Sequence, residues 1–178
     1  FGLGHLLGSP TAPGGIVDTP PIREALAARL AVMWHNHFAT SNVKVRSPAM
    51  MLQQLRTIES LALGKFGELL LSMARDPAMI AWLDGNENAK GRPNENFARE
   101  LMELFTLGRG QYSEQDIHEA ARAFTGWGFK LDTAEFHFRE NQHDFGEKTF
   151  RGKTGNFDGD DILDLLLADR RRHRRFAR

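Results

Sequence analysis

Residues 93–127, PNENFARELMELFTLGRGQYSEQDIHEAARAFTGW, decide how this chain folds. Asn94 is placed to cap a helix that continues to about Leu107, where a glycine-rich turn ends it. Ser113 and Asp116 have the spacing of a capping box, which predicts the start of a second helix. The stretch therefore predicts two capped helices joined by a short turn.

The first of these helices carries a dense set of polar side chains. They are Asn94, Glu95, Asn96, Arg99, Glu100 and Glu103. At about 100° per residue, Leu101 and Leu104 fall on an apolar face, and Asn96, Glu100 and Glu103 form a strip beside it. A carboxylate at the edge of a core needs a partner or a raised pKa. Two interpretations stay open, a network that locks neighbouring helices and a catalytic or ligand site.

Outside this stretch the sequence predicts a mainly α fold, an orthogonal multi-helix domain with a small irregular or β-like insert near residues 128–157. Apolar spacing, prolines and glycines place the other helices at about residues 19–38, 47–63, 68–74, 76–83 and 160–168. The first of them carries Ile22, Leu26, Leu30 and Met33 on one face. Short extended segments are expected near residues 135–139 and 148–151.

Composition divides the chain into three parts and excludes several classes of function. We expect an irregular segment over residues 1–18, a single helical domain over 19–169 that belongs to a longer protein, and an Arg-rich tail over 170–178. The net charge is zero, but the tail holds six Arg, so residues 1–169 carry 17 basic against 23 acidic side chains. An acidic body argues against specific nucleic-acid binding. The chain has no cysteine, and no apolar run reaches the ~18 residues of a membrane span.

A polar loop before the central helix has the spacing of a calcium-binding loop. Asp84, Asn86, Asn88 and Glu95 occupy positions one, three, five and twelve of a twelve-residue loop between predicted helices. Position six is Ala89, where a calcium loop has glycine. Asn and Asp are also common in turns for conformational reasons, and this alternative stays open. The calcium hypothesis is the one metal site that spacing alone supports.

Two histidines and one tryptophan are further candidates. His37 falls on the apolar face of its helix, where we favour a core histidine over a ligand or general base. His143 and Asp144 lie in a turn and would act as base and orienting group if they met Glu100 and Glu103 in space. For Asp144 we favour an Asx turn ahead of the following glycine. Trp127 lines a pocket or closes the core, and we favour the core.

Several longer motifs resemble the bacterial domain-of-unknown-function 1800 family. They are WLDG at 82–85, PNENFARELMELFTLG at 93–108, AARAFTGW at 120–127, HDFGEKTFRG at 143–152 and GDDILDLLL at 159–167. The resemblance implies an exported bacterial protein, periplasmic or extracellular, and a partner of the domain-of-unknown-function 1501 family. It implies no reaction. The residues that match the motifs are His37, Asn94, Glu95, Asn96, Arg99, Glu100, Glu103, Trp127, His143 and Asp144.

Two functions are consistent with these observations. The first is a helical scaffold or binding module in which the polar residues set the helix geometry. The alternative is an extracellular hydrolase or lyase acting on a polymer such as a polysaccharide. It would use Glu100 or Glu103 with His143, with or without a divalent cation, and it requires the acidic strip to meet the His143–Asp144 turn.

Overall fold

The computed structural model describes the chain from residue 20 to residue 176, with side chains described from residue 20 to residue 169. The irregular segment expected over residues 1–18 lies outside this range, as do the side chains of the Arg-rich tail. The described part is mainly α, with two small sheets, as the sequence predicts.

The first half of the described chain forms five α-helices. They are α1 (Pro20–Phe38), α2 (Asn42–Val45), α3 (Pro48–Leu61), α4 (Phe66–Ala74) and α5 (Pro77–Trp82). Ser47 and Asp76 cap α3 and α5, because their side-chain oxygens accept hydrogen bonds from the backbone N–H groups of Met50 and Met79. The four longer helices confirm the prediction, and α2 is an additional short turn.

The second half of the described chain contains the central motif and the remaining helical elements. Its helical elements are η1 (Gly85–Glu87), α6 (Asn96–Glu100), the π-helix η2 (Leu101–Thr106), α7 (Glu114–Ala123), η3 (Glu140–Gln142) and α8 (Gly159–Phe176). The capping box of Ser113 and Asp116 is present at the start of α7, as predicted. The last helix extends further than predicted, since its backbone remains helical into the Arg-rich tail.

The β insert consists of two separate antiparallel hairpins. In one, β1 (Trp127–Phe129) pairs with β2 (Phe136–Phe138), and in the other, β3 (Lys148–Phe150) pairs with β4 (Lys153–Gly155). The extended segments expected near residues 135–139 and 148–151 are confirmed as β2 and β3. They belong to different sheets, and each pairs with a neighbouring segment.

The π-helix changes which side chains of the central motif reach the core. In η2 the Leu107 N–H donates to the carbonyl of Met102, five residues earlier. Each turn therefore holds more residues than an α-helix, and side-chain directions drift from the 100° spacing. Leu104, expected on the core face, is 49% exposed, whereas Met102 is fully buried. Leu101 is buried as predicted, so the predicted core face is wrong at Leu104 and omits Met102.

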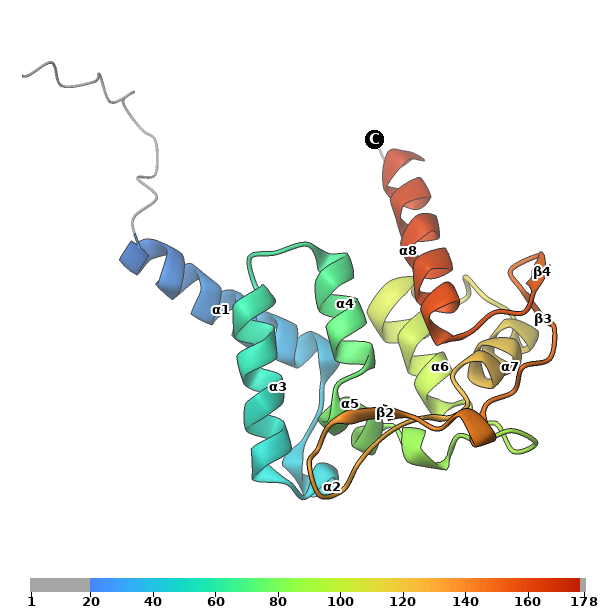
Figure 1. Cartoon of the computed structure of the whole chain (residues 1–178). Coiled ribbons are helices and arrows are strands. Elements are labelled where there is room, and N and C mark those ends of the chain that lie inside the picture. Colours follow the sequence, from blue (N-terminus) through green and yellow to red (C-terminus); the bar gives the residue numbers. More distant parts are fainter. Residues whose placement is uncertain (1–19, 177–178) are drawn as a thin grey trace, which may run out of the picture.

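The helices gather in two groups (Figure 1). In this view α1, α2 and α3 lie on the left, α6, α7 and α8 lie on the right, and α4 and α5 stand between them. The first half of α1 projects beyond α3, so Ile22 and Leu26 remain exposed. Met33, in the second half, is also exposed, although its spacing predicts the same apolar face. Helix α1 instead buries Ala31 and Phe38.

Candidate functional site

Asn88 joins the polar loop to the end of α7. Its side chain is buried, with Nδ2 donating to the Ala121 carbonyl at 2.9 Å and Oδ1 accepting from the Asn94 N–H at 2.9 Å. The Asn88 carbonyl accepts from the Gly126 N–H at 3.0 Å. Carbonyls in the last turn of a helix lack a partner within the helix, so Asn88 satisfies one of them. One of these hydrogen bonds fixes the loop to α7, one fixes it to the segment after α7, and the third closes the loop on itself.

Asn94 and Asn96 fix the start of α6 to the end of α5. The Asn94 Oδ1 accepts from the Asn96 N–H at 3.0 Å, and its Nδ2 donates to the Asp84 carbonyl at 3.4 Å. The Asn96 Nδ2 donates to the Leu83 carbonyl at 3.3 Å. The residue at the N-cap position is Glu95, and its side chain makes no capping bond. The predicted cap at Asn94 is thus wrong by one position, because Asn94 forms an Asx turn instead.

Four side chains of alternating charge link α6 to α7. The Arg99 guanidinium donates to both carboxylate oxygens of Glu114, at 3.0 and 2.7 Å, and to Glu95 at 3.3 Å. The second oxygen of Glu95 lies 3.2 Å from the Nδ1 of His118. Glu95, Arg99 and His118 are half-exposed and Glu114 is largely exposed, so water screens each pair, and the two-pronged contact of Arg99 with Glu114 links the two helices at the surface.

The two carboxylates proposed for acid/base chemistry differ in their surroundings. Glu103 accepts hydrogen bonds from the Arg109 Nε at 2.5 Å and the Tyr112 hydroxyl at 2.9 Å. The bond from Arg109, followed by that from Tyr112, lowers the pKa of Glu103. Glu103 is thus held ionised as an acceptor. Glu100 is half-buried, and its carboxylate makes no hydrogen bond or ion pair with any other side chain between residues 20 and 169.

His143 is buried among aromatic side chains. Its ring is 3% exposed and packs edge-on against Phe138 and Phe145, with ring centroids 5.2 and 4.6 Å apart. The Nδ1 lies 2.7 Å from the Thr125 carbonyl. A carbonyl only accepts hydrogen bonds, so Nδ1 carries a proton in this contact.

Asp144 pairs with α7. Its Oδ2 accepts from the Arg122 Nε at 2.8 Å, and its Oδ1 accepts from the Gly146 N–H at 2.8 Å. The second bond closes the Asx turn that the sequence favours. The hydrogen bond from Arg122 holds the pKa of Asp144 down at about 2. Arg122 also donates to Glu119 at 2.8 Å, so one guanidinium lies between two carboxylates.

The acidic strip of α6 and the His143–Asp144 turn are not brought together by direct contact. Helix α7 contacts both regions. Its Glu114 and His118 bond to Arg99 and Glu95 at the start of α6, and its Arg122 bonds to Asp144 in the turn. No hydrogen bond or ion pair within residues 20–169 joins either carboxylate of the strip to the turn. The expectation that these groups meet is therefore wrong. It fails because Glu103 bonds to Arg109 and Tyr112, in the turn before α7, whereas Asp144 bonds to Arg122 on α7.

The polar loop engages its side-chain oxygens in hydrogen bonds. Asp84 accepts from the Lys44 ammonium at 2.7 Å, and the Asn86 Oδ1 accepts from the Phe129 N–H at 3.0 Å. Asn88 and Glu95 are engaged as described above. Over the described part of the chain, no three His, Asp or Glu side chains group in a way that would hold a metal ion. These contacts argue against the calcium-loop hypothesis and favour a loop held by hydrogen bonds.

His37 and Trp127 both pack in aromatic clusters. The His37 ring lies 5.1 Å from Phe38 and 6.0 Å from Phe105, which joins α1 to η2. Trp127 is buried, and its ring stands edge-on to Phe124 at 5.1 Å. Beside Asn88 and Trp127 the enclosed space measures only about 10 Å³, which is room for no more than about one water. Among the described residues, the space beside Phe38 and Phe105 is smaller still, so neither of these two spaces is of ligand size.

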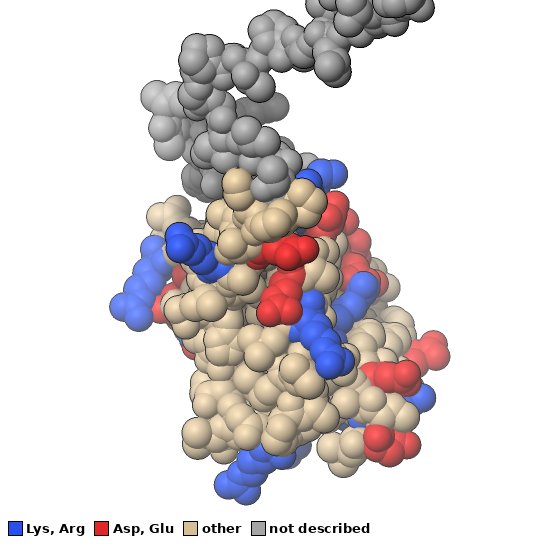
Figure 2. Space-filling model, turned by 90° about the vertical axis from the view of Figure 1, so that its left-hand side faces the viewer, with Lys and Arg blue, Asp and Glu red and all other residues tan. Residues whose placement is uncertain are grey.

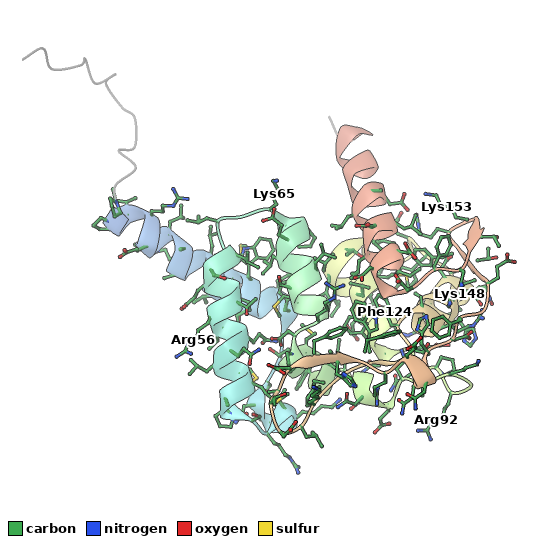
Figure 3. The ribbon with its side chains drawn as sticks, viewed as in Figure 1. Arg56, Lys65, Arg92, Phe124, Lys148 and Lys153 are labelled. Carbon is green, nitrogen blue, oxygen red and sulfur yellow. The ribbon has the colours of Figure 1, made fainter. Side chains whose placement is uncertain are left out.

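Two buried polar groups are missed by the sequence patterns. Lys148 is almost fully buried, and its ammonium donates to the carbonyls of Asp144 and Gly146 at 2.6 and 2.9 Å. Figure 3 shows Lys148 within the second half of the protein, whereas Arg92 lies at its edge. Burial lowers the pKa of this lysine. The only sequence signal is its alternation with Phe150 in β3.

A second buried group joins α3 to α5. The Gln54 Nε2 donates to the Asp76 Oδ1 at 2.6 Å, and the Thr40 hydroxyl donates to the Oε1 of Gln54. Burial raises the pKa of Asp76 to about 6, although the hydrogen bonds from Met79 and Gln54 oppose the rise. Asp76 is recognisable from sequence as a helix cap, but its link to Gln54 is not, since the two are distant along the chain.

Comparison with known proteins identifies one family. The model of the family described as "Protein of unknown function (DUF1800)" matches residues 20–178. No curated protein and no solved structure is significantly similar to the chain. No helix within the described residues is long and apolar enough to cross a membrane.

Proposed function

Since the chain belongs to the DUF1800 family of proteins of unknown function, we propose from its own contacts that it is a helical scaffold or binding module. The proposal assigns a structural role to the residues of the family motif. In this view the polar residues of the PNENFARE segment position α5, α6 and α7 relative to one another. They do not act on a substrate.

One observation carries the proposal: Asn94, Asn96 and Arg99 of this segment, together with Asn88 in the loop before it, bond to neighbouring elements of the same chain. Asn88 and Asn94 bond to backbone groups of α7 and of the loop after α5, and Arg99 bridges α6 and α7. Each buried amide that finds a backbone partner avoids a desolvation cost of about 1–3 kcal/mol, so such residues specify one arrangement of the helices. A scaffold needs this fixed arrangement.

The alternative, a hydrolase or lyase on a polymer, has less support. It requires two carboxylates and a histidine around one open cleft. Glu103 instead forms a closed group with Arg109 and Tyr112, and His143 bonds to Thr125 on the other side of α7. The open grooves near α3 lie away from all of these residues.

The location and partner of the module are proposed from the family resemblance alone. We place it in the periplasm or outside the cell, where a protein of the domain-of-unknown-function 1501 family would be its partner. Co-purification of the two proteins from the native envelope tests this pairing. Recovery of the module only from the cytoplasm would contradict the location.

An assay that separates folding from turnover tests the module hypothesis. The wild type and the variants Glu100→Gln and Glu103→Gln are incubated with a panel of soluble polysaccharides, and new reducing ends are measured. We expect no turnover by any of the three, and we expect Glu100→Gln to retain the wild-type melting temperature. Turnover by the wild type that either variant abolishes while remaining folded would refute the proposal and support the alternative.

A further inference from the structure

The outward face of α3 and the turn after it carries a symmetrical stripe of side chains. The stripe consists of Leu52, Arg56, Glu59 and Leu63. At about 100° per residue Leu52, Arg56 and Glu59 fall within about 60° of one another, opposite the buried face of Gln54 and Ile58, and Leu63 follows in the turn after α3. Leu52 is 48% exposed and Leu63 is 39% exposed. Exposed leucines on either side of a charged pair form a surface that can contact another molecule.

We propose that this stripe binds a second copy of the same chain, as an antiparallel α3–α3 pair across a two-fold axis. Each leucine lies four positions along the chain from the charged residue next to it. One antiparallel alignment therefore places Leu52 opposite Leu63 of the second copy and Arg56 opposite its Glu59. Two-fold symmetry repeats every contact, so each copy contributes the same patch.

The charges of the stripe are available for this pairing. Neither Arg56 nor Glu59 forms an ion pair with another side chain between residues 20 and 169. Figure 3 shows Arg56 extending from α3 away from the body of the protein. A parallel pair, or a shift by one turn, would place like charges or a charge and a leucine opposite one another. The charge pattern thus selects one orientation and one register.

The small polar residues beside the stripe need no partner from outside. The Thr57 hydroxyl donates to the Gln53 carbonyl at 3.1 Å, and the Ser60 hydroxyl donates to the Thr57 carbonyl at 2.9 Å. Their hydrogen-bonding groups are engaged within α3, so a second helix can approach closely without leaving a hydroxyl donor unsatisfied. Short side chains at such positions permit this close approach.

The surface along the stripe is open. One open groove of about 480 Å³ runs along α3 past Leu52, Arg56 and Ser60. A second groove of about 460 Å³ continues between α1 and α3 to Leu63. Figure 2 shows the side of the molecule that carries α1 and α3, and its lower half is mostly uncharged, with a band of mixed charges above. The proposed pairing lies apart from the α6–α7 contacts and is independent of the function proposed for them.

Charge reversal tests the pairing. The oligomeric state of the full chain is measured by sedimentation from about 1 µM to about 1 mM, the range in which weak interfaces are populated. Arg56→Glu and Glu59→Arg should each raise the dimer dissociation constant about tenfold or more, because two attractive pairs become repulsive. The double variant Arg56→Glu/Glu59→Arg restores opposite charges and should regain dimerisation. Arg92→Glu, at an exposed arginine far from α3, is the matched control and should leave the dissociation constant unchanged.

Leu52→Asp tests the apolar part of the pairing and should also weaken the dimer. Circular dichroism and melting temperature show whether each variant remains folded, which is expected because the substituted side chains are exposed. A wild type that stays monomeric throughout the concentration range would overturn the proposal. A dimer that the single reversals leave intact, or that the double variant fails to restore, would overturn it as well.

Discussion

Replacing Asn88 with alanine should destabilise the protein through the end of α7. The substitution removes the donor to the Ala121 carbonyl and the acceptor for the Asn94 N–H, both at 2.9 Å. The site is buried, with Asn88 only 2% exposed, and water cannot easily replace either bond. Each backbone group left without a partner costs about 1–3 kcal/mol, so the free energy of unfolding should fall by about 2–4 kcal/mol.

Thermal and urea denaturation measure this loss. In a domain of this size the melting temperature should fall by about 5–15 °C. Asn141→Ala is the matched control, because Asn141 is exposed in η3 and should change the free energy of unfolding by less than about 0.5 kcal/mol. Asn88→Asp adds a further test, since it keeps an acceptor for the Asn94 N–H and loses the donor to Ala121.

A small effect of Asn88→Ala would refute the structural role assigned to the loop. If Asn88→Ala melts within about 2 °C of Asn141→Ala, then the two hydrogen bonds contribute little. The polar residues before α6 would then not hold the helices in place, and the scaffold hypothesis would lose its main support.

Two further predictions concern other buried positions. Because burial raises the pKa of Asp76 to about 6, the folded state binds more protons than the unfolded state between pH 4 and 6, and stability falls as pH rises through this window. Relative to Asp76→Asn, the wild type should lose about 2–3 kcal/mol of unfolding free energy between pH 4 and pH 7. Urea denaturation measures this difference, and an equal change with pH in the two proteins would contradict the prediction. Gly159→Ala should destabilise the protein by about 1–3 kcal/mol, because its Cβ would lie 2.5 Å from the Trp127 ring, and a melting temperature equal to that of the wild type would show that the ring moves aside.

Features that depend on neighbouring residues could be predicted from the sequence. The capping box of Ser113 and Asp116 involves groups three residues apart, so it predicts the start of α7 without reference to the rest of the fold. The same holds for the cap at Asp76 and for the Asx turn from Asp144 to Gly146. In each case the partners lie within one turn of the chain.

Features that depend on distant segments could not. The partner of Asp144 is Arg122, on a helix 22 residues earlier, and no local pattern distinguishes that arginine from its neighbours. The helical wheel of the central motif placed Leu104 wrongly for a different reason. It assumes a constant rotation per residue, and the wide turns of η2 move Met102 inward and Leu104 outward.

The π-helix has a consequence for insertions and deletions in this segment. A wide turn accommodates one more residue than an α-helical turn of the same height, so η2 is equivalent to a single-residue insertion that the helix has absorbed. Deleting one residue between Leu101 and Thr106 would leave a helix but rotate Arg109 and Tyr112 away from Glu103. The spacing of the PNENFARELMELFTLG motif therefore encodes a rotational offset between α6 and the chain that follows it.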